Sequence, residues 1–292
     1  MDAPSGTVIW SKTWDIGPGE AFRFHAGVVQ LILRSLVREA RQKVELAATI
    51  DRPVTPEGYE LYLRANQLSF QGTPENNALA RDLYVSCLEK DPNYAPAWAR
   101  LARCYRYLEK FGTETARHTH LAQEAFQRAF ALNPDLGLAH NLYTPLQTDL
   151  GQAECAMVRL LRRATSHEND PELFTGLVHA SRYCGQLKAS IAAHERVLRL
   201  DRTARTGVAH TYFLMGDYEK TLYWYGTGFG LYLDALALAC MGRLEEASAL
   251  LWTRRDRFHL LGESNELALG LPGGQTRRGH CGVAPASASQ FV

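Results

Sequence analysis

Three arginines and a tyrosine in the segment 100–107 have the spacing needed to act together on an anionic ligand. Arg100, Arg103, Arg106 and Tyr107 lie three or four residues apart, and such intervals place side chains on one face of an α-helix. A guanidinium group can donate two charge-assisted hydrogen bonds to one carboxylate. The segment therefore predicts a cationic strip. The alternative is an ordinary solvated helix face, because charged side chains are common on protein surfaces.

Further polar residues occur at comparable positions along the chain. They are Asn141, His179, Arg182, Tyr183 and His210. If these side chains share a surface with the arginine strip, they could bind the backbone or a carboxylate of an extended peptide. The two sets together are named the predicted groove residues.

Catalytic and metal-binding patterns are not found in the sequence. His118, His120 and His140 are close in sequence, but no third ligand follows at a zinc-like spacing, and no two of the six cysteines form a Cys-x-x-Cys pair. The nucleophile elbow, the phosphate-binding loop and the His-Glu-x-x-His helix are also missing. We therefore expect no enzyme, no metal and no cofactor.

Composition narrows the class of protein. The chain has 292 residues, of which 46% are hydrophobic, as expected of a folded protein. Lysine and arginine number 32 against 31 acidic residues, so no global charge attracts nucleic acid or a membrane surface. No apolar stretch has a membrane-spanning length, and no signal peptide begins the chain. We expect a cytoplasmic protein that binds neither nucleic acid nor membrane.

The elements that position the groove residues are indicated by a helix stop and a helix start between Asp91 and Trp98. The following helix carries Trp98, Leu101, Ala102 and Tyr105, and the preceding helix carries Ala80, Tyr84, Cys87 and Pro92. This pattern resembles a tetratricopeptide (TPR) repeat, whose period is about 34 residues. The resemblance implies an all-α, right-handed superhelix of helical hairpins. Its concave groove would be lined by the first helix of each pair.

The hairpins are predicted from helix caps, prolines and apolar periodicity. About six helix pairs are expected in residues 57–262, beginning with helices near 56–70 and 74–90. The interval from Pro92 to Pro134 exceeds the usual period, which predicts extra residues between Phe111 and His118. The third pair, near 136–150 and 152–165, is the weakest, because Pro145 favours a kinked or shortened helix.

The chain ends are predicted to differ from this array. Residues 7–14 read as a strand and residues 20–41 as a helix, followed by a linker at 51–56. Residues 271–292 have the composition of a disordered tail. Residues 6–15 and 56–64 resemble the join between a TolB-like α/β domain and TPR repeats in bacterial cyclase-type or winged-helix signalling proteins. This resemblance implies that residues 1–50 are a strand-helix remnant of such a domain.

The function expected from these patterns is a non-catalytic scaffold that binds a protein or peptide in the groove. The resemblance implies a regulatory role in bacterial signalling. Some TPR proteins bind C-terminal carboxylates through a Lys/Asn/Arg clamp, but this chain does not place those residues at matching positions of three successive repeats. A self-assembly module is the alternative, and an enzyme with an unrecognised site is the third reading.

Overall fold

The computed structural model describes residues 53–112, 118–226 and 232–254, and every helix in these ranges belongs to a helical hairpin. The helices are α3 (Pro56–Phe70), α4 (Pro74–Lys90), α5 (Ala95–Phe111), α6 (His118–Leu132), α7 (Gly137–Asp149), α8 (Ala153–Ala164), α9 (Pro171–Tyr183), α10 (Leu187–Leu200), α11 (Val208–Leu214), α12 (Tyr218–Tyr225), α13 (Leu233–Cys240) and α14 (Leu244–Thr253). Each odd-numbered helix packs against the helix that follows it. Within the described residues, the predicted all-α hairpin fold is confirmed, and the array is TPR-like.

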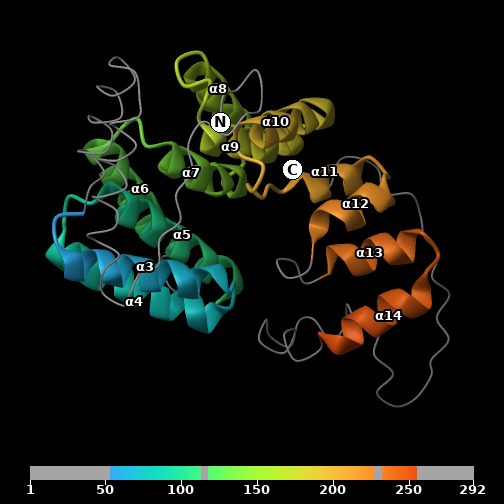
Figure 1. The fold of residues 1–292 in the computed structure, drawn as a ribbon, viewed down its shortest axis with the longest axis horizontal. Helices are drawn as coiled ribbons and strands as arrows, with labels where there is room; N and C mark the ends of the chain where they lie inside the picture. Colours follow the sequence, from blue (N-terminus) through green and yellow to red (C-terminus); the bar gives the residue numbers. More distant parts are fainter. Residues whose placement is uncertain (1–52, 113–117, 227–231, 255–292) are drawn as a thin grey trace, which may run out of the picture.

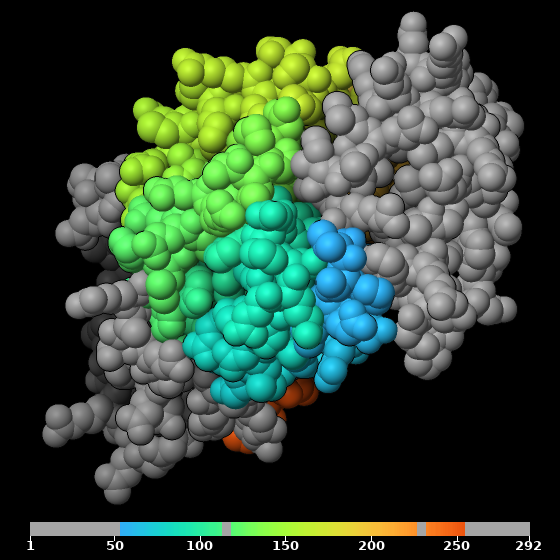
Figure 2. All heavy atoms as spheres, turned by 90° about the vertical axis from the view of Figure 1, so that its left-hand side faces the viewer, coloured from blue at the N-terminus to red at the C-terminus, as the bar shows by residue number. Residues whose placement is uncertain are grey.

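The hairpins follow one another along an arc from α3–α4 through α8–α10 to α13–α14 (Figure 1). Figure 2 shows the same chain order on the surface, where blue is followed by teal, then green, then yellow-green. The expected strand at 7–14, the helix at 20–41 and the tail at 271–292 lie outside the described residues.

Local sequence signals determine where the helices begin. Thr55 and Thr73 cap α3 and α4, since their hydroxyl oxygens accept hydrogen bonds from backbone N–H groups three residues later at 3.1 and 3.2 Å. A proline follows each cap in the first helical turn, where its missing N–H costs nothing. Asp170 caps α9 through its carboxylate, whose Oδ1 accepts from the Glu172 N–H two residues later at 3.0 Å.

Most hairpins turn through a glycine with positive φ. Gly185 and Gly216 have φ values of +72° and +78°, which a residue with a Cβ adopts only with strain. The second hairpin differs, because α5 ends at Phe111 and α6 begins at His118, and residues 113–117 lie outside the described ranges.

The helix with the TPR-like signature joins two cores. Leu101 of α5 lies in the core formed with α3 and α4, whereas Ala102 lies in the core formed with α6 and α7. Trp98 and Tyr105 pack against both cores. The alternation of large and small side chains therefore lets one helix fill spaces on two sides.

Helix α7 runs through Pro145 without a break. Proline removes one backbone donor, but two hydroxyl groups make further hydrogen bonds along the helix. Thr144 Oγ1 donates to the His140 carbonyl and Thr148 Oγ1 to the Pro145 carbonyl, both at 2.8 Å. This helix packs against both α5 and α9.

Close packing brings α9 against α7 and α8. A Cβ built on Gly176 of α9 would lie 3.1 Å from Leu160 Cδ1 and 3.3 Å from Thr144 Oγ1. These distances are shorter than ordinary van der Waals contacts. The close packing of α9 against α7 and α8 therefore depends on residue 176 having no Cβ.

Candidate functional site: the inner face of the array

Two basic side chains of α5 share one carboxylate of α7. Arg106 Nε lies 2.6 Å from Asp149 Oδ2, and Lys110 Nζ lies 3.3 Å from Asp149 Oδ1. The Asp149 side chain keeps 30% of its surface exposed. Two positive charges therefore meet a single negative charge at a solvent-accessible position.

The next contact joins α7 to α9 through an imidazole. His179 Nε2 lies 3.1 Å from Thr148 Oγ1, and Arg182 Nη2 lies 3.1 Å from His179 Nδ1. An arginine can only donate, so Nδ1 accepts and the imidazole is neutral with its proton on Nε2. Nε2 then donates to the threonine hydroxyl.

Arg182 extends this chain of contacts to the following hairpin. Its Nη1 donates to the Gly207 carbonyl, just before α11, at 2.8 Å. The guanidinium carbon also lies 5.3 Å from the centre of the Tyr183 ring, and that ring stacks on His179 at 4.7 Å. Tyr183 is 53% exposed, so an aromatic surface borders the guanidinium group.

The basic side chains of three helices act on the same imidazole. Burial is the main cause that lowers the pKa of His179 well below its usual value, and the positive charges of Arg182, Arg106 and Lys110 lower it further, with His210 of α11 in the same electrostatic environment. Desolvation and then Arg182 lower the pKa of His210 to about 4. The five residues Arg106, Lys110, His179, Arg182 and His210 are named the inner-face cluster. At neutral pH its positive charge resides on Arg106, Lys110 and Arg182.

Tyr183 borders this cluster, but the remaining predicted groove residues do not join it. Arg103 Nη1 donates to the Ser69 carbonyl at 3.4 Å, and the Tyr107 hydroxyl donates to the Gly72 carbonyl, so both bridge to the first hairpin. Arg100 is half-buried. The hydroxyl groups of Tyr62 and Tyr84, both from the first hairpin, interact electrostatically with its guanidinium.

Asn141 is separate again, because it donates to a carboxylate oxygen of Glu172. The expected continuous cationic strip is therefore divided. Its first part bridges to the first hairpin, and its last arginine belongs to the inner-face cluster.

Three residues of this surface were not among the predicted groove residues. Lys110 follows Arg106 by one helical turn, a spacing that could have identified it. Thr148 and Asp149 have no such signal, because their role depends on which turn of α7 meets α5 and α9.

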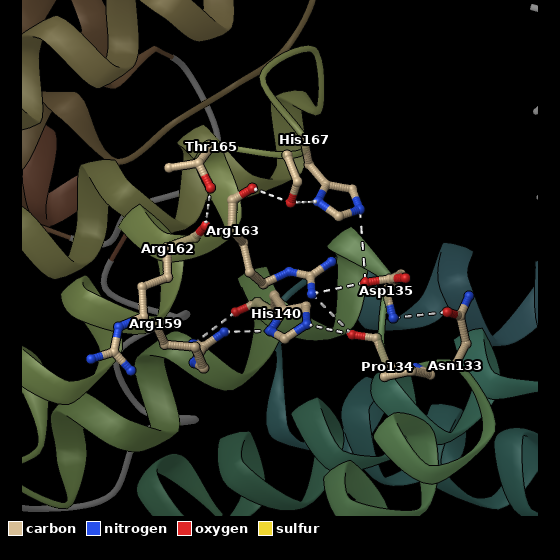
Figure 3. Close-up of polar contacts among 10 residues, drawn as sticks. Asn133, Pro134, Asp135, His140, Arg159, Arg162, Arg163, Thr165 and His167 are labelled. Atoms are coloured by element: carbon tan, nitrogen blue, oxygen red, sulfur yellow. Dashed lines mark hydrogen bonds and ion pairs between the residues drawn. The ribbon is translucent and has the colours of Figure 1, made fainter.

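A second polar group lies between α7 and α8 and is shown in Figure 3. Arg159 Nε donates to Gln147 Oε1 at 3.0 Å, and its Nη atoms donate to His140 Nδ1, to the His140 carbonyl and to Thr144 Oγ1. Burial lowers the pKa of Arg159 to about 10, which leaves it charged at neutral pH. All of these acceptors are neutral, and the Arg159 guanidinium carbon also lies 5.3 Å from the centre of the Tyr143 ring, so this arginine ties the two helices together without an ion pair.

His140 completes this group. Its Nε2 donates to the Pro134 carbonyl at 2.9 Å while Nδ1 accepts from Arg159. Burial is the main cause that lowers the pKa of His140 to about 4, and Arg163 and Arg159 add to the effect. The contacts are internal, and we assign them to the stability of the third hairpin.

The described residues contain no group of three or more His, Cys, Asp or Glu side chains arranged to hold a metal ion. None of the helices in these ranges is long and apolar enough to cross a membrane. An open hollow of about 430 Å³ is lined by residues 215–219 and Met241, which belong to the turns of the last two hairpins.

Comparisons with known proteins give no family. No protein-family model and no curated protein matches the sequence. Among solved structures, the chain is similar to one described as "Crystal structure of MamA protein", with a TM-score of 0.35 and 14% sequence identity. The match covers 76% of this chain and 98% of that chain. A similarity at this level carries no argument about function, so the site is interpreted from its own residues.

Proposed function

We propose that this protein is a non-catalytic scaffold that binds a segment of a partner protein across the first helices of successive hairpins. The observation that carries the proposal is the inner-face cluster, in which three hairpins contribute side chains to one accessible, polar surface. Repeat arrays characteristically use such extended surfaces for binding. The proposed surface is the concave groove of a right-handed superhelix.

Several properties of the cluster favour binding over catalysis. Burial lowers the pKa of both imidazoles, which makes them weak bases, and each of the arginines Arg106 and Arg182 is already fixed by a contact to a neighbouring hairpin. Fixed donors bind a ligand with little loss of side-chain entropy. We therefore assign the cluster to recognition.

The biological context is a further part of the proposal. The sequence resemblance to the TolB-like junction supports a regulatory role in bacterial signalling, with a cytoplasmic location. Residues 6–15, which carry half of that resemblance, lie outside the described residues. The role therefore rests on the sequence pattern alone.

Self-assembly is the second candidate function. Large apolar side chains are exposed in the last two hairpins, at Tyr223, Leu236 and Leu244. Exposed apolar groups of this kind favour association when they are contiguous. Light scattering at increasing protein concentration tests this candidate, and a constant monomer mass would contradict it.

The main proposal can be tested by selection from a random peptide library on the full-length protein. We expect enriched peptides whose binding is lost in Arg182→Glu and retained in Arg199→Glu, a matched charge reversal on the exposed side of α10. Circular dichroism of both variants checks that the helices are intact. Failure to enrich any peptide, or equal binding to both variants, would overturn the proposal.

A further inference from the structure

The charge balance of the inner-face cluster indicates the chemistry of its partner. Arg182 contacts two neutral acceptors, the Gly207 carbonyl and His179 Nδ1. Within the described part of the chain, no acidic side chain forms an ion pair with Arg182. An arginine has five N–H donors, and these two contacts leave part of that capacity for a ligand. This guanidinium is a cation that the described fold does not neutralise.

The second cationic position is only partly neutralised. Arg106 and Lys110 together carry two positive charges against the single charge of Asp149. The Lys110 side chain is close to half exposed. A ligand carboxylate that reaches this position would meet the same donors that Asp149 now uses.

The two positions are connected through one residue. Besides burial, the positive charges of Arg182 on its own helix and of Arg106 and Lys110 on α5 lower the pKa of His179. Thr148 contacts His179, and the next residue, Asp149, contacts Arg106 and Lys110, so these cations lie around a common region. The exposed Tyr183 ring borders the same region and offers an apolar surface beside the charges.

We infer that the inner-face cluster binds an extended acidic segment of a partner protein, with one side-chain carboxylate on Arg182 and another competing with Asp149 for Arg106 and Lys110. This inference rests on the proposed function and names its partner class. It concerns side-chain carboxylates within a segment, so a free C-terminus is not required. Asp149 acts as an internal competitor that lowers the affinity of the site.

The test measures binding of three labelled peptides of equal length to the full-length protein by fluorescence anisotropy. The peptides are built from Glu and Ser, from Gln and Ser, and from Lys and Ser, and all have amidated C-termini. We expect the acidic peptide to bind at least about tenfold more tightly than the other two, with an affinity that falls as salt is added. Equal affinities of the acidic and neutral peptides would overturn the inference.

Three variants make the expected pattern specific. Arg182→Gln should weaken binding of the acidic peptide by about tenfold or more, because a charge-assisted pair is lost. Asp149→Asn should strengthen it by about threefold, because it removes a competing negative charge. Arg199→Gln on α10 is the matched control and should leave the affinity unchanged. Circular dichroism confirms the fold of each variant.

The outcomes separate the inference from the function it rests on. If library peptides bind in an Arg182-dependent way but are not acidic, the inference is wrong and the proposed function stands. If neither the library nor the defined peptides bind, both are wrong. If Asp149→Asn weakens binding as much as Arg182→Gln, the competing role of Asp149 is excluded, because the carboxylate then serves to orient Arg106.

Discussion

The first two hairpins and the last two have the same helix-turn-helix form but are held together by different interactions. Helices α3–α6 are 15 to 17 residues long, whereas α11–α14 have 7 to 10 residues. The first region buries aromatic side chains such as Tyr84 and Phe126 completely. The cluster between α13 and α14 has only Ala235, Leu238 and Ala247 as buried members.

An ion pair compensates in part for the small apolar cluster at the end of the array. Arg254 donates to both carboxylate oxygens of Asp234 at 2.9 and 2.8 Å, and both side chains are largely buried. The difference teaches that a repeat can keep its form while its stabilisation changes from apolar packing to directional polar contacts. The inner-face cluster takes its residues from both regions, on α5 and α11, and from α9 between them.

The largest effect expected from this comparison is a core truncation in the first region. Phe126→Ala in α6 should lower the free energy of unfolding by about 3–5 kcal/mol, because it removes a fully buried ring. Leu222→Ala beside the last core should cost less than about 2 kcal/mol, because that side chain is only half-buried. Urea denaturation followed by tryptophan fluorescence measures both. Equal losses would contradict the comparison.

A smaller effect is expected from protonation of His140 in the third hairpin. Its pKa is about 4 in the folded protein and near 6.5 when unfolded, so the unfolded chain binds the proton more readily. The stabilisation is fully present above pH 6.5 and is lost as the pH falls towards 4, by up to about 3 kcal/mol.

Denaturation curves of the wild type and His140→Gln across this pH range measure the effect. The unfolding free energy of the wild type should fall more steeply towards acid pH than that of His140→Gln. His179 and His210 contribute in the same direction to both proteins, so the difference between the curves reports His140. His120→Gln is the control, because that ring is mostly exposed. Parallel curves for wild type and His140→Gln would exclude a role of this imidazole.

The ion pair of the last hairpin should contribute next in size. Asp234→Ala leaves Arg254 without its carboxylate, and we expect the free energy of opening α13 and α14 to fall by about 2 kcal/mol. Native-state hydrogen exchange of the amides in α13 and α14 measures this local opening. Asp82→Ala removes an exposed pair in the first hairpin and should change nothing measurable. Unchanged exchange in α13 and α14, or an equal acceleration throughout α3–α6, would contradict this assignment.

The smallest effect concerns a helix cap in the first region. Thr73→Ala removes the hydroxyl that accepts from the Asn76 N–H and should lower the unfolding free energy by about 1 kcal/mol. Thr73→Ser keeps the acceptor and should retain most of the stability. Thermal unfolding measures both variants, and a loss in the serine variant equal to that in the alanine variant would argue against capping.

The sequence predicts the helices better than it predicts the contacts between them. Helix starts follow from caps and prolines, so Pro56–Phe70 and Pro74–Lys90 agree with the expected ranges. Trp98 and Leu101 likewise occupy the cores that the repeat pattern implies. These signals are local, because each depends on residues within one or two helical turns.

The candidate site required information that is not local. The nine predicted groove residues include Arg106, His179, Arg182 and His210, which the structure brings into one electrostatic environment. The pairing of Arg106 with Asp149 joins residues 43 positions apart and depends on the register between α5 and α7. The division of the arginine strip has the same cause, since the Ser69 and Gly72 carbonyls come from another hairpin.

The hydrogen atom that serves as the side chain of Gly176 has a consequence for recognition at a distance. It sets how closely α9 lies against α7 and α8, and thereby the interval between the cations on α5 and those on α9. An added methyl group would press on Leu160 of α8 and Thr144 of α7, and these side chains or α9 itself would have to shift. The spacing of charges that a partner must match thus depends on a residue that the partner does not contact.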